Sequence, residues 1–312
     1  MSGETYEVFA VRYGHMDRRA SENFLGGCAC DGPMPIDYYV WVVRSAERTV
    51  VVDTGFGPAE GIRRGRRVLN PVGTGLAALG VDPAHVDDVV LTHLHYDHAG
   101  NLGLFPNARF HLQERELQFV VGRHMADPTT ASAYAVEEIA DAVRLVHAGR
   151  VRFAAEDEEL FPGLSVHLVG GHTGGTQVVR VATARGPLVL ASDAVHFYAN
   201  LEKRRVFAVT HDPDHLLEVY DRRLSELVDD PADIVPGHDP LVLARYPAAR
   251  TGLEGVVALL SDAPGPSDGL AGGRGGAPPE PVGTPVSTSC RPSSRRAGPD
   301  ELAEVSVRLL EF

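Results

Sequence analysis

The sequence predicts an α+β domain followed by a disordered tail. Hydrophobic residues make up 44% of the 312 residues, which is enough to form a core. Short β-rich runs alternate with helical patterns up to residue 262. Gly and Pro then fill 16 of the 36 positions from 264 to 299, and such a segment buries too little apolar surface to order itself. We therefore expect one folded domain over 1–262 and a disordered tail over 263–312, with a short helix near its end at 300–312.

Hydrophobic patterning locates the elements of this domain. Residues 38–43 and 49–52 are apolar runs joined by a polar turn, which predicts a β-hairpin. Asp-Pro-Asp at 212–214 is a helix-start signal, because an acidic cap residue stands beside a proline. The other predicted strands cover 6–11, 87–92, 109–112, 165–169, 176–183, 188–191 and 233–235, and helices are predicted over 114–121, 131–146 and 215–227.

Composition and charge argue against several classes of protein. The chain carries 29 Lys and Arg against 42 Asp and Glu, a net charge of −13, whereas nucleic-acid binding requires clustered basic residues. No apolar run approaches the roughly 18 residues of a membrane span, and the start lacks the features of a signal peptide. Three cysteines are too few for a disulfide framework. We expect a cytoplasmic protein that binds neither nucleic acid nor membrane.

Candidate metal ligands are concentrated directly after the predicted strand 87–92. Residues 93–98 read His-Leu-His-Tyr-Asp-His, and their three imidazoles and one carboxylate suit zinc, manganese or iron. A single tetrahedral zinc ion would not use all four side chains, so we expect two adjacent ions and further ligands at other strand ends. Those further candidates each follow a predicted strand: His172, Asp193 and His238.

These residues resemble the metal site of the metallo-β-lactamase superfamily, over roughly residues 6–250. Val-Asp-Thr-Gly at 52–55 also resembles an early turn of that superfamily, in which the aspartate supports the site without binding metal. The resemblance implies a four-layer αββα sandwich with two divalent ions at one edge, with Zn²⁺ as the leading candidate. It also implies the ligand sets: His93, His95 and His172 for one ion, Asp97, His98 and His238 for the other, and Asp193 as the bridge. The alternative is that these are ordinary core or surface residues. That alternative requires seven histidines and aspartates to occur in the superfamily's order by chance.

Two ions bridged by a carboxylate can share a water molecule and lower its pKa, so that a bridging hydroxide attacks a carbonyl or phosphoryl centre. Asp97 is placed both to bind metal and to orient the nucleophile or pass a proton to the leaving group. No serine or cysteine nucleophile is then required. The sequence therefore predicts a dinuclear metal-dependent hydrolase.

Within the superfamily, the chain is most similar to the N-acyl homoserine lactonases, which open acylated lactones. Ser-Asp-Ala at 192–194, the 45-residue gap to Pro-Gly-His at 236–238 and Asn-Phe-Leu-Gly-Gly at 23–27 carry this resemblance. Flavodiiron proteins have Glu in place of His95, and true zinc β-lactamases have Cys or Ser in place of Asp193. The resemblance therefore implies a small lactone or ester as substrate, with N-acyl homoserine lactones first.

The chain departs from the lactonases after the bridging aspartate. They place a tyrosine three residues later, where its phenol can hydrogen-bond the substrate carbonyl, whereas this chain has His196 there and its nearest phenol is Tyr198. We expect one of these two side chains to take a catalytic role beside the substrate.

Other functions remain alternatives. Ester, thioester or phosphodiester hydrolysis can use the same scaffold, although a phosphodiester would favour a basic rim and the net charge is −13. A mononuclear iron dioxygenase and a non-catalytic metal-binding protein are further alternatives, but no ligand is missing. The sequence is compatible with both a monomer and a homodimer.

Overall fold

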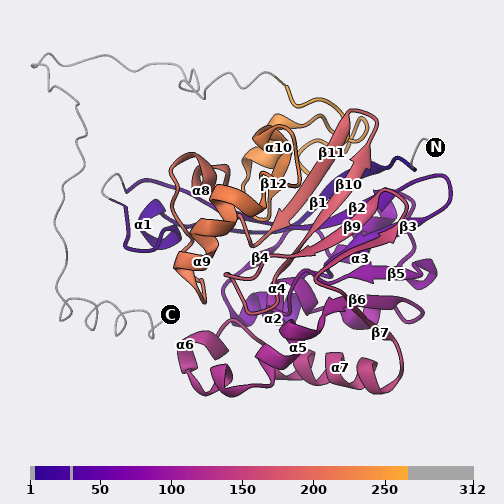
Figure 1. Cartoon of the computed structure of the whole chain (residues 1–312). Coiled ribbons are helices and arrows are strands. Elements are labelled where there is room, and N and C mark those ends of the chain that lie inside the picture. Colours follow the sequence, from indigo (N-terminus) through magenta and orange to yellow (C-terminus); the bar gives the residue numbers. More distant parts are fainter. Residues whose placement is uncertain (1–3, 29–30, 266–312) are drawn as a thin grey trace, which may run out of the picture. The chain divides into compact units, whose positions relative to one another are not determined.

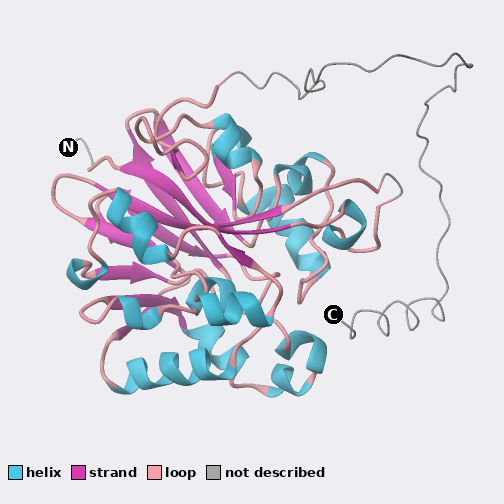
Figure 2. Cartoon of the chain, turned by 180° about the vertical axis from the view of Figure 1, so that it is seen from behind, coloured by secondary structure: helices cyan, strands magenta, loops and turns pink. Residues whose placement is uncertain are grey.

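A computed structural model of the chain describes residues 4–28 and 31–265 (Figure 1). Two β-sheets pack face to face, and helices cover the outer face of each sheet, which confirms the predicted α+β class and the αββα sandwich (Figures 1 and 2). The strands are β1 (Glu7–Met16), β2 (Ile36–Arg44), β3 (Thr49–Val52), β4 (Arg67–Val68), β5 (Asp88–Val90), β6 (Arg109–Gln113), β7 (Val151–Ala154), β8 (Asp157–Phe161), β9 (Leu164–Leu168), β10 (Gln177–Thr183), β11 (Gly186–Ser192), β12 (Ile234–Pro236) and β13 (Val257–Leu259). The α-helices are α1 (Ala20–Asn23), α2 (Pro58–Arg63), α3 (Val72–Ala78), α4 (Tyr96–Ala99), α5 (Glu114–Val120), α6 (Pro128–Ala131), α7 (Val136–His147), α8 (Tyr198–Glu202), α9 (Pro213–Glu218) and α10 (Leu241–Arg245).

Strand order brings several strand ends to one edge of the sandwich. The first sheet has the order β13-β1-β2-β3-β5-β6-β7, with β4 paired to β1, and the second has the order β12-β11-β10-β9-β8. Strands β3, β5, β6 and β7 are parallel, as are β11 and β12. Parallel neighbours end at the same edge of their sheet, so the segments after β3 and β5 meet at one edge of the first sheet and those after β11 and β12 meet at one edge of the second.

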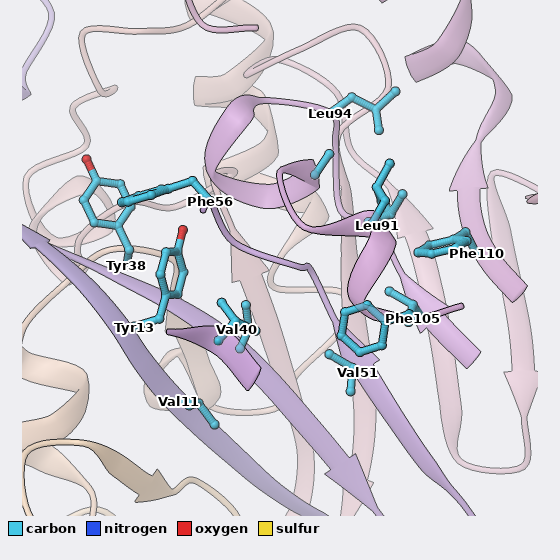
Figure 3. Packing of buried hydrophobic residues seen from close by; sticks show 14 of the residues in the cluster. Val11, Tyr13, Tyr38, Val40, Val51, Phe56, Leu91, Leu94, Phe105 and Phe110 are labelled. Atoms are coloured by element: carbon cyan, nitrogen blue, oxygen red, sulfur yellow. The ribbon is translucent and has the colours of Figure 1, made fainter. Parts of the chain in front are cut away.

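The central strands are buried on both faces, which is why β2, β3 and β11 are apolar at most positions. In β2, Tyr39 and Trp41 point between the sheets, whereas Val40 and Val42 point toward the helices, as the two-residue period of a strand requires. Figure 3 shows this outer packing: Val40 lies with Val51 and other apolar residues against which the helices pack.

Each outer layer has its own hydrophobic core. Helices α3, α4, α5 and α7 contribute to the core on the first sheet, and α9 with the segment that follows it packs on the second (Figure 1). The two sheets and their helices form a scaffold in which a site at the sheet edge is held by elements far apart in sequence.

Most of the predicted elements are confirmed, including the hairpin of β2 and β3, but two helices differ. The predicted helix 131–146 is broken: α6 ends at Ala131, a turn follows, and α7 begins at Val136. The turn is held from outside, because the backbone oxygen of Ala133 accepts a hydrogen bond from the Tyr96 N–H at 3.1 Å. The predicted helix 215–227 begins at Pro213 with Asp212 as its cap, and a π-helical turn replaces the α-helix after Glu218.

Sequence reasoning did not predict β4, β7, β8 and β13, which are short or partly exposed. The predicted tail, 263–312, lies outside the described residues except for its first three positions, and so does the predicted helix at 300–312. In the part of the chain that the structure describes, no helix is both long and apolar enough to cross a membrane.

Candidate metal centre

The seven predicted ligands come together at one edge of the sandwich, and all of them are buried. They lie on four segments, each of which follows a strand. One pair of histidines lies between β5 and α4, and an aspartate and a histidine lie in α4 itself; the loop from β9 to β10 and the residues after β11 and β12 supply the rest. In that order they are His93, His95, Asp97, His98, His172, Asp193 and His238.

The ligand atoms form two groups. Within each group, all ligand atoms lie within 4.8 Å of one another, which is close enough to surround a single ion. These groups match the two ligand sets expected from the sequence, while metal binding by them stays a prediction. The first group is His93, His95, His172 and Asp193, and the second is Asp97, His98 and His238.

Asp193 lies between the two groups. Its Oδ2 is 3.2 Å from His172 Nε2 and 3.8 Å from His93 Nε2. Its Oδ1 is 3.1 Å from His98 Nε2 and 2.9 Å from His238 Nε2. One carboxylate oxygen therefore faces each group, which is an arrangement that allows a carboxylate to bridge two ions.

Hydrogen bonds on the far side of the rings orient two of the histidines. Nδ1 of His98 lies 2.7 Å from Oδ2 of Asp53, and Nδ1 of His238 donates to the backbone oxygen of Asp37 at 2.9 Å. In the neutral ring, a proton held on Nδ1 leaves the lone pair of Nε2 free to bind a metal. Asp53 thus supports the centre without being one of the clustered ligands.

Asp53 also connects β3 to the strand that precedes the histidine string. Its two oxygens accept hydrogen bonds from the backbone N–H and the side-chain hydroxyl of Thr92, at 2.7 and 2.8 Å. Oγ1 of Thr92 in turn lies 3.1 Å from Nδ1 of His93. One buried carboxylate therefore positions histidines of both groups.

Glu116 is a supporting residue that sequence reasoning missed. This fully buried side chain in α5 accepts hydrogen bonds from the backbone N–H groups of Leu94 and Gly175 at 3.0 Å and from the Thr173 hydroxyl at 2.5 Å. It therefore joins the loop of His93 and His95 to the loop of His172. Nothing in the sequence distinguishes Glu116, because acidic residues in a first helical turn are common.

The backbone next to Asp193 is strained and tightly packed. Ser192 has a φ of +46°, a left-handed conformation that a non-glycine residue rarely adopts. Gly237 lies against it, and a Cβ atom at that position would be 2.6 Å from the Ser192 backbone oxygen. This close approach of the turns after β11 and β12 brings Asp193 to His238, and Gly237 is the residue that permits it.

The electrostatics of the site favour positive charge. Burial by itself lowers the pKa of His98, but the carboxylates of Asp193, Asp53 and Asp97 outweigh burial and raise it well above its usual value. Burial, together with the neighbouring imidazoles of His98 and His95, lowers the pKa of His93. Three carboxylates in one buried volume attract a cation, and the imidazoles supply neutral ligands to it.

Buried polar atoms that make no hydrogen bond show whether the cluster is suited to bind a metal ion. Among the described residues, His93 Nε2 is buried and has no hydrogen-bond partner, and His98 Nε2 and Asp193 Oδ1, although 3.1 Å apart, do not meet the geometry of a hydrogen bond. Unpartnered buried polar atoms are costly, and divalent ions bound to these atoms remove that cost. The imidazole and carboxylate donor set therefore fits two divalent ions.

The structure separates the two candidates for the missing tyrosine. Nε2 of His196 is 3.1 Å from Oδ2 of Asp193, and the His196 ring stacks on Phe207 with 3.7 Å between centroids. His196 also lies close enough to Asp193 and His238 to act as a further ligand. Tyr198 instead lies in the core between the sheets, beneath the guanidinium of Arg245. Its phenol is therefore not part of the cluster.

The metallo-beta-lactamase superfamily model matches residues 35–238, a range that contains every ligand candidate. The chain belongs to the metallo-beta-lactamase superfamily. An N-acyl homoserine lactonase of a Bacillus species is 27% identical over 226 residues, which cover 65% of this chain and 82% of the relative. A second N-acyl homoserine lactonase, from Agrobacterium fabrum, is 30% identical over 213 residues, which cover 62% of this chain and 74% of the relative.

A solved structure of an N-acyl homoserine lactone hydrolase, with N-hexanoyl-L-homoserine bound at its metal centre, has the same metallo-beta-lactamase fold. It matches with a TM-score of 0.61 at 23% identity and covers 77% of this chain and 94% of the other. At this identity the likeness shows the fold alone. The function of this chain must therefore be argued from its own site.

Proposed function

We propose that this chain, a metal-dependent hydrolase of the metallo-beta-lactamase superfamily, uses two divalent ions to open the ring of a lactone, with N-acyl homoserine lactones as the first substrate class. The observation that carries the proposal is Asp193, whose two oxygens face the two ligand groups. The two lactonase relatives, which match most of the domain, support the choice of reaction.

The residues of the chain would hold the ions in two sets. His93, His95 and His172 would hold one, Asp97, His98 and His238 would hold the other, and Asp193 would contact both. Zinc is the favoured metal because imidazole nitrogen and carboxylate oxygen are its usual ligands in hydrolases. Bound there, the ions would supply hydroxide near neutral pH and polarise the carbonyl of the substrate.

The chain itself supplies orientation and proton transfer. Oδ2 of Asp97 lies 3.8 Å from Nε2 of both His98 and His238, so this carboxylate reaches the centre of its group. There it can accept a proton from the nucleophile and donate it to the leaving alkoxide. The backbone oxygen of Asp97 accepts a hydrogen bond from the Tyr13 hydroxyl at 2.7 Å, which fixes the turn.

His196 is the second catalytic candidate. Burial lowers its pKa to about 3, so the ring is neutral at physiological pH. A neutral ring that donates from Nε2 to Asp193 holds the bridging carboxylate in place. We propose His196 as the group beside the reacting centre, in the position where the lactonases have tyrosine.

Metal analysis and a substrate panel test the function. Purified protein is expected to contain two divalent ions per chain and to open N-acyl homoserine lactones, with proton release as the readout. Replacement of the proton carrier, Asp97→Asn, is expected to lower kcat by about 100-fold or more. His238→Ala is expected to lose one ion together with activity.

The control is His85→Ala, because His85 is exposed and lies outside the cluster. This variant should keep both ions and full activity. A protein with one iron and no hydrolase activity would contradict the proposal in favour of a dioxygenase. If thioesters or phosphodiesters are hydrolysed and lactones are not, the proposed dinuclear centre stands and the proposed substrate class is wrong.

A further inference from the structure

Arg66, in the turn between α2 and β4, lies beside the second ligand group. Its Nε donates a hydrogen bond to the Tyr96 hydroxyl at 3.2 Å, and Tyr96 directly precedes Asp97. The Tyr96 hydroxyl lies 3.4 Å from that of Tyr38, whose ring packs edge-on against His238 with 5.2 Å between centroids. Two phenols therefore connect this guanidinium to the ligands of one ion.

Arg18, just before α1, approaches the same region from another segment. Its guanidinium lies over the Phe207 ring, 5.4 Å from the centroid, and the same ring stacks on the imidazole of His196. One N–H group of Arg18 donates to the Glu22 backbone oxygen at 2.8 Å. Segments that are far apart in sequence thus place two guanidinium groups next to the residues around the metal centre.

Neither guanidinium forms an ion pair with a carboxylate of the described residues. Among the described residues, no Asp or Glu oxygen lies within 4.0 Å of either Arg18 or Arg66, whereas the neighbouring Arg64 and Arg67 pair with Glu60 and Asp17. Both side chains are half-buried, and Nε of Arg18 is fully buried and has no hydrogen-bond partner among those residues. Unpaired charge removed from water is costly unless a ligand compensates it.

The two arginines also repel each other. Burial lowers the pKa of Arg18; the Glu22 carboxylate opposes this effect, and the positive charge of Arg66 adds to it. A bound anion would replace this repulsion by attraction to both groups. Guanidinium presents a planar fork of N–H donors that matches the oxygens of carboxylate and phosphate, so these are the anions that such a pair binds best.

We propose that Arg18 and Arg66 bind an anionic group of the substrate, a carboxylate or a phosphate, that is separate from the bond being hydrolysed. This inference rests on the proposed function and narrows its substrate class. N-acyl homoserine lactones with simple acyl chains are neutral, so the preferred substrate is a lactone or ester that carries a negative charge elsewhere. Because the chain as a whole carries a net charge of −13, which repels anions, any attraction of an anionic substrate must come from these two local guanidinium groups.

Matched substrates test the charge preference. The metal-loaded enzyme is given N-hexanoyl homoserine lactone and two analogues in which the terminal methyl is replaced by carboxylate or by phosphate. We expect kcat/KM to be about tenfold or more higher for at least one anionic analogue, which is the size of one or two charge-assisted hydrogen bonds. Which analogue is preferred identifies the anion.

Variants then assign the preference to the two arginines. Arg18→Met keeps the apolar contact with Phe207, and Arg66→Gln keeps a donor toward Tyr96, so the fold should be retained. Each variant is expected to lower kcat/KM for the anionic substrate by about tenfold and to leave the neutral substrate within about threefold. Arg67→Met is the matched control, because Arg67 is exposed and already paired with Asp17. Equal losses on neutral and anionic substrates would overturn the proposal.

A binding measurement separates this inference from the proposed function. By isothermal titration calorimetry, the metal-loaded protein is expected to bind succinate, glutarate or adipate at least about tenfold tighter than butyrate, because only the dicarboxylates can reach both metal and arginine. Arg18→Met and Arg66→Gln should abolish that difference. If no lactone is opened but the difference is present, the lactonase function fails and the anion site stands. If wild-type protein binds all four acids equally, the anion site is wrong.

Discussion

Asp53 illustrates how a residue outside the ligand set controls the centre. It fixes the ring of His98 through Nδ1, so we expect Asp53→Asn to weaken metal binding at the group of Asp97, His98 and His238 by 10-fold to 100-fold, the usual effect of losing such a support. Asn tolerates the left-handed backbone that Asp53 adopts, with φ of +60°, so the substitution removes charge without adding strain. Dialysis against a chelator followed by metal analysis should show the preferential loss of one ion. Because Asp53 contacts His98 directly and reaches His93 only through Thr92, the ion of the His98 group should be lost first, and retention of both ions would contradict this role of Asp53.

At the same scale, the identity of the ligands could be predicted but some of their partners could not. His93, His172 and Asp193 each follow a strand with a buried, apolar pattern, so they stand out in the sequence. Glu116 does not, because its role depends on three donors contributed by loops distant in sequence. His196 and Tyr198 could not be separated from sequence, because neighbouring side chains in a turn point in directions that only packing fixes.

Helix α7 carries a buried carboxyl group whose titration should be measurable. Burial, together with the carboxylates of Glu60 and Asp97, raises the pKa of Glu138 to about 8 from an ordinary 4.5, and its Oε2 has no hydrogen-bond partner among the described residues. The folded state therefore binds this proton more tightly than the unfolded state. The contribution of Glu138 to stability is present below about pH 4.5 and is lost as the pH rises through about 8.

We expect Glu138→Gln to remove the decrease in stability that the ionisation of Glu138 causes as the pH rises. The free energy of unfolding of the variant, relative to wild type, should rise by at least about 1 kcal/mol between pH 5 and pH 9, measured by urea denaturation at each pH. Glu137→Gln, on the exposed face of the same helix, is the matched control and should show no such trend. A difference that is constant with pH would show that Glu138 ionises normally.

Elements were predicted well where local pattern decides and poorly where a distant contact decides. The hairpin of β2 and β3 was predicted from two apolar runs and the polar turn between them. The two paired strands are neighbours in the sequence, so local pattern is sufficient. The break between α6 and α7 does not, because it serves contacts outside the helix: the turn supplies an acceptor to Tyr96 and places the Tyr134 ring 4.5 Å from that of His95. Tertiary contacts override helical periodicity there.

For the whole molecule, bound metal should be a major source of stability, because the ligand cluster joins both sheets. Removal of metal with a chelator is expected to lower Tm by about 5 °C or more, since ions that bind only the folded state stabilise it by mass action. Differential scanning fluorimetry measures the shift, and added Zn²⁺ should reverse it. Asp193→Ala should be insensitive to the chelator. A wild-type Tm that does not respond would argue against a metal centre.

The C-terminal segment provides a second test at this scale. We expect a chain truncated after Asp262 to keep its metal content and lactonase activity, because every ligand candidate precedes that residue. Metal analysis and the proton-release assay on the truncated and full-length proteins make the comparison. Loss of both ions on truncation would show that residues 263–312 are a structural part of the centre.

Local patterns were enough to predict the fold class, the candidate ligands and their order, because imidazole or carboxylate side chains follow strands with a buried pattern. How Asp193 faces both groups, that His196 rather than Tyr198 lies with them, and that Arg18 and Arg66 lie near the centre without an ion-pair partner among the described residues follow only from the folded arrangement. Side-chain direction and charge pairing arise from contacts between segments up to about 200 residues apart, such as the hydrogen bond from His238 to Asp37, and no local pattern encodes those contacts.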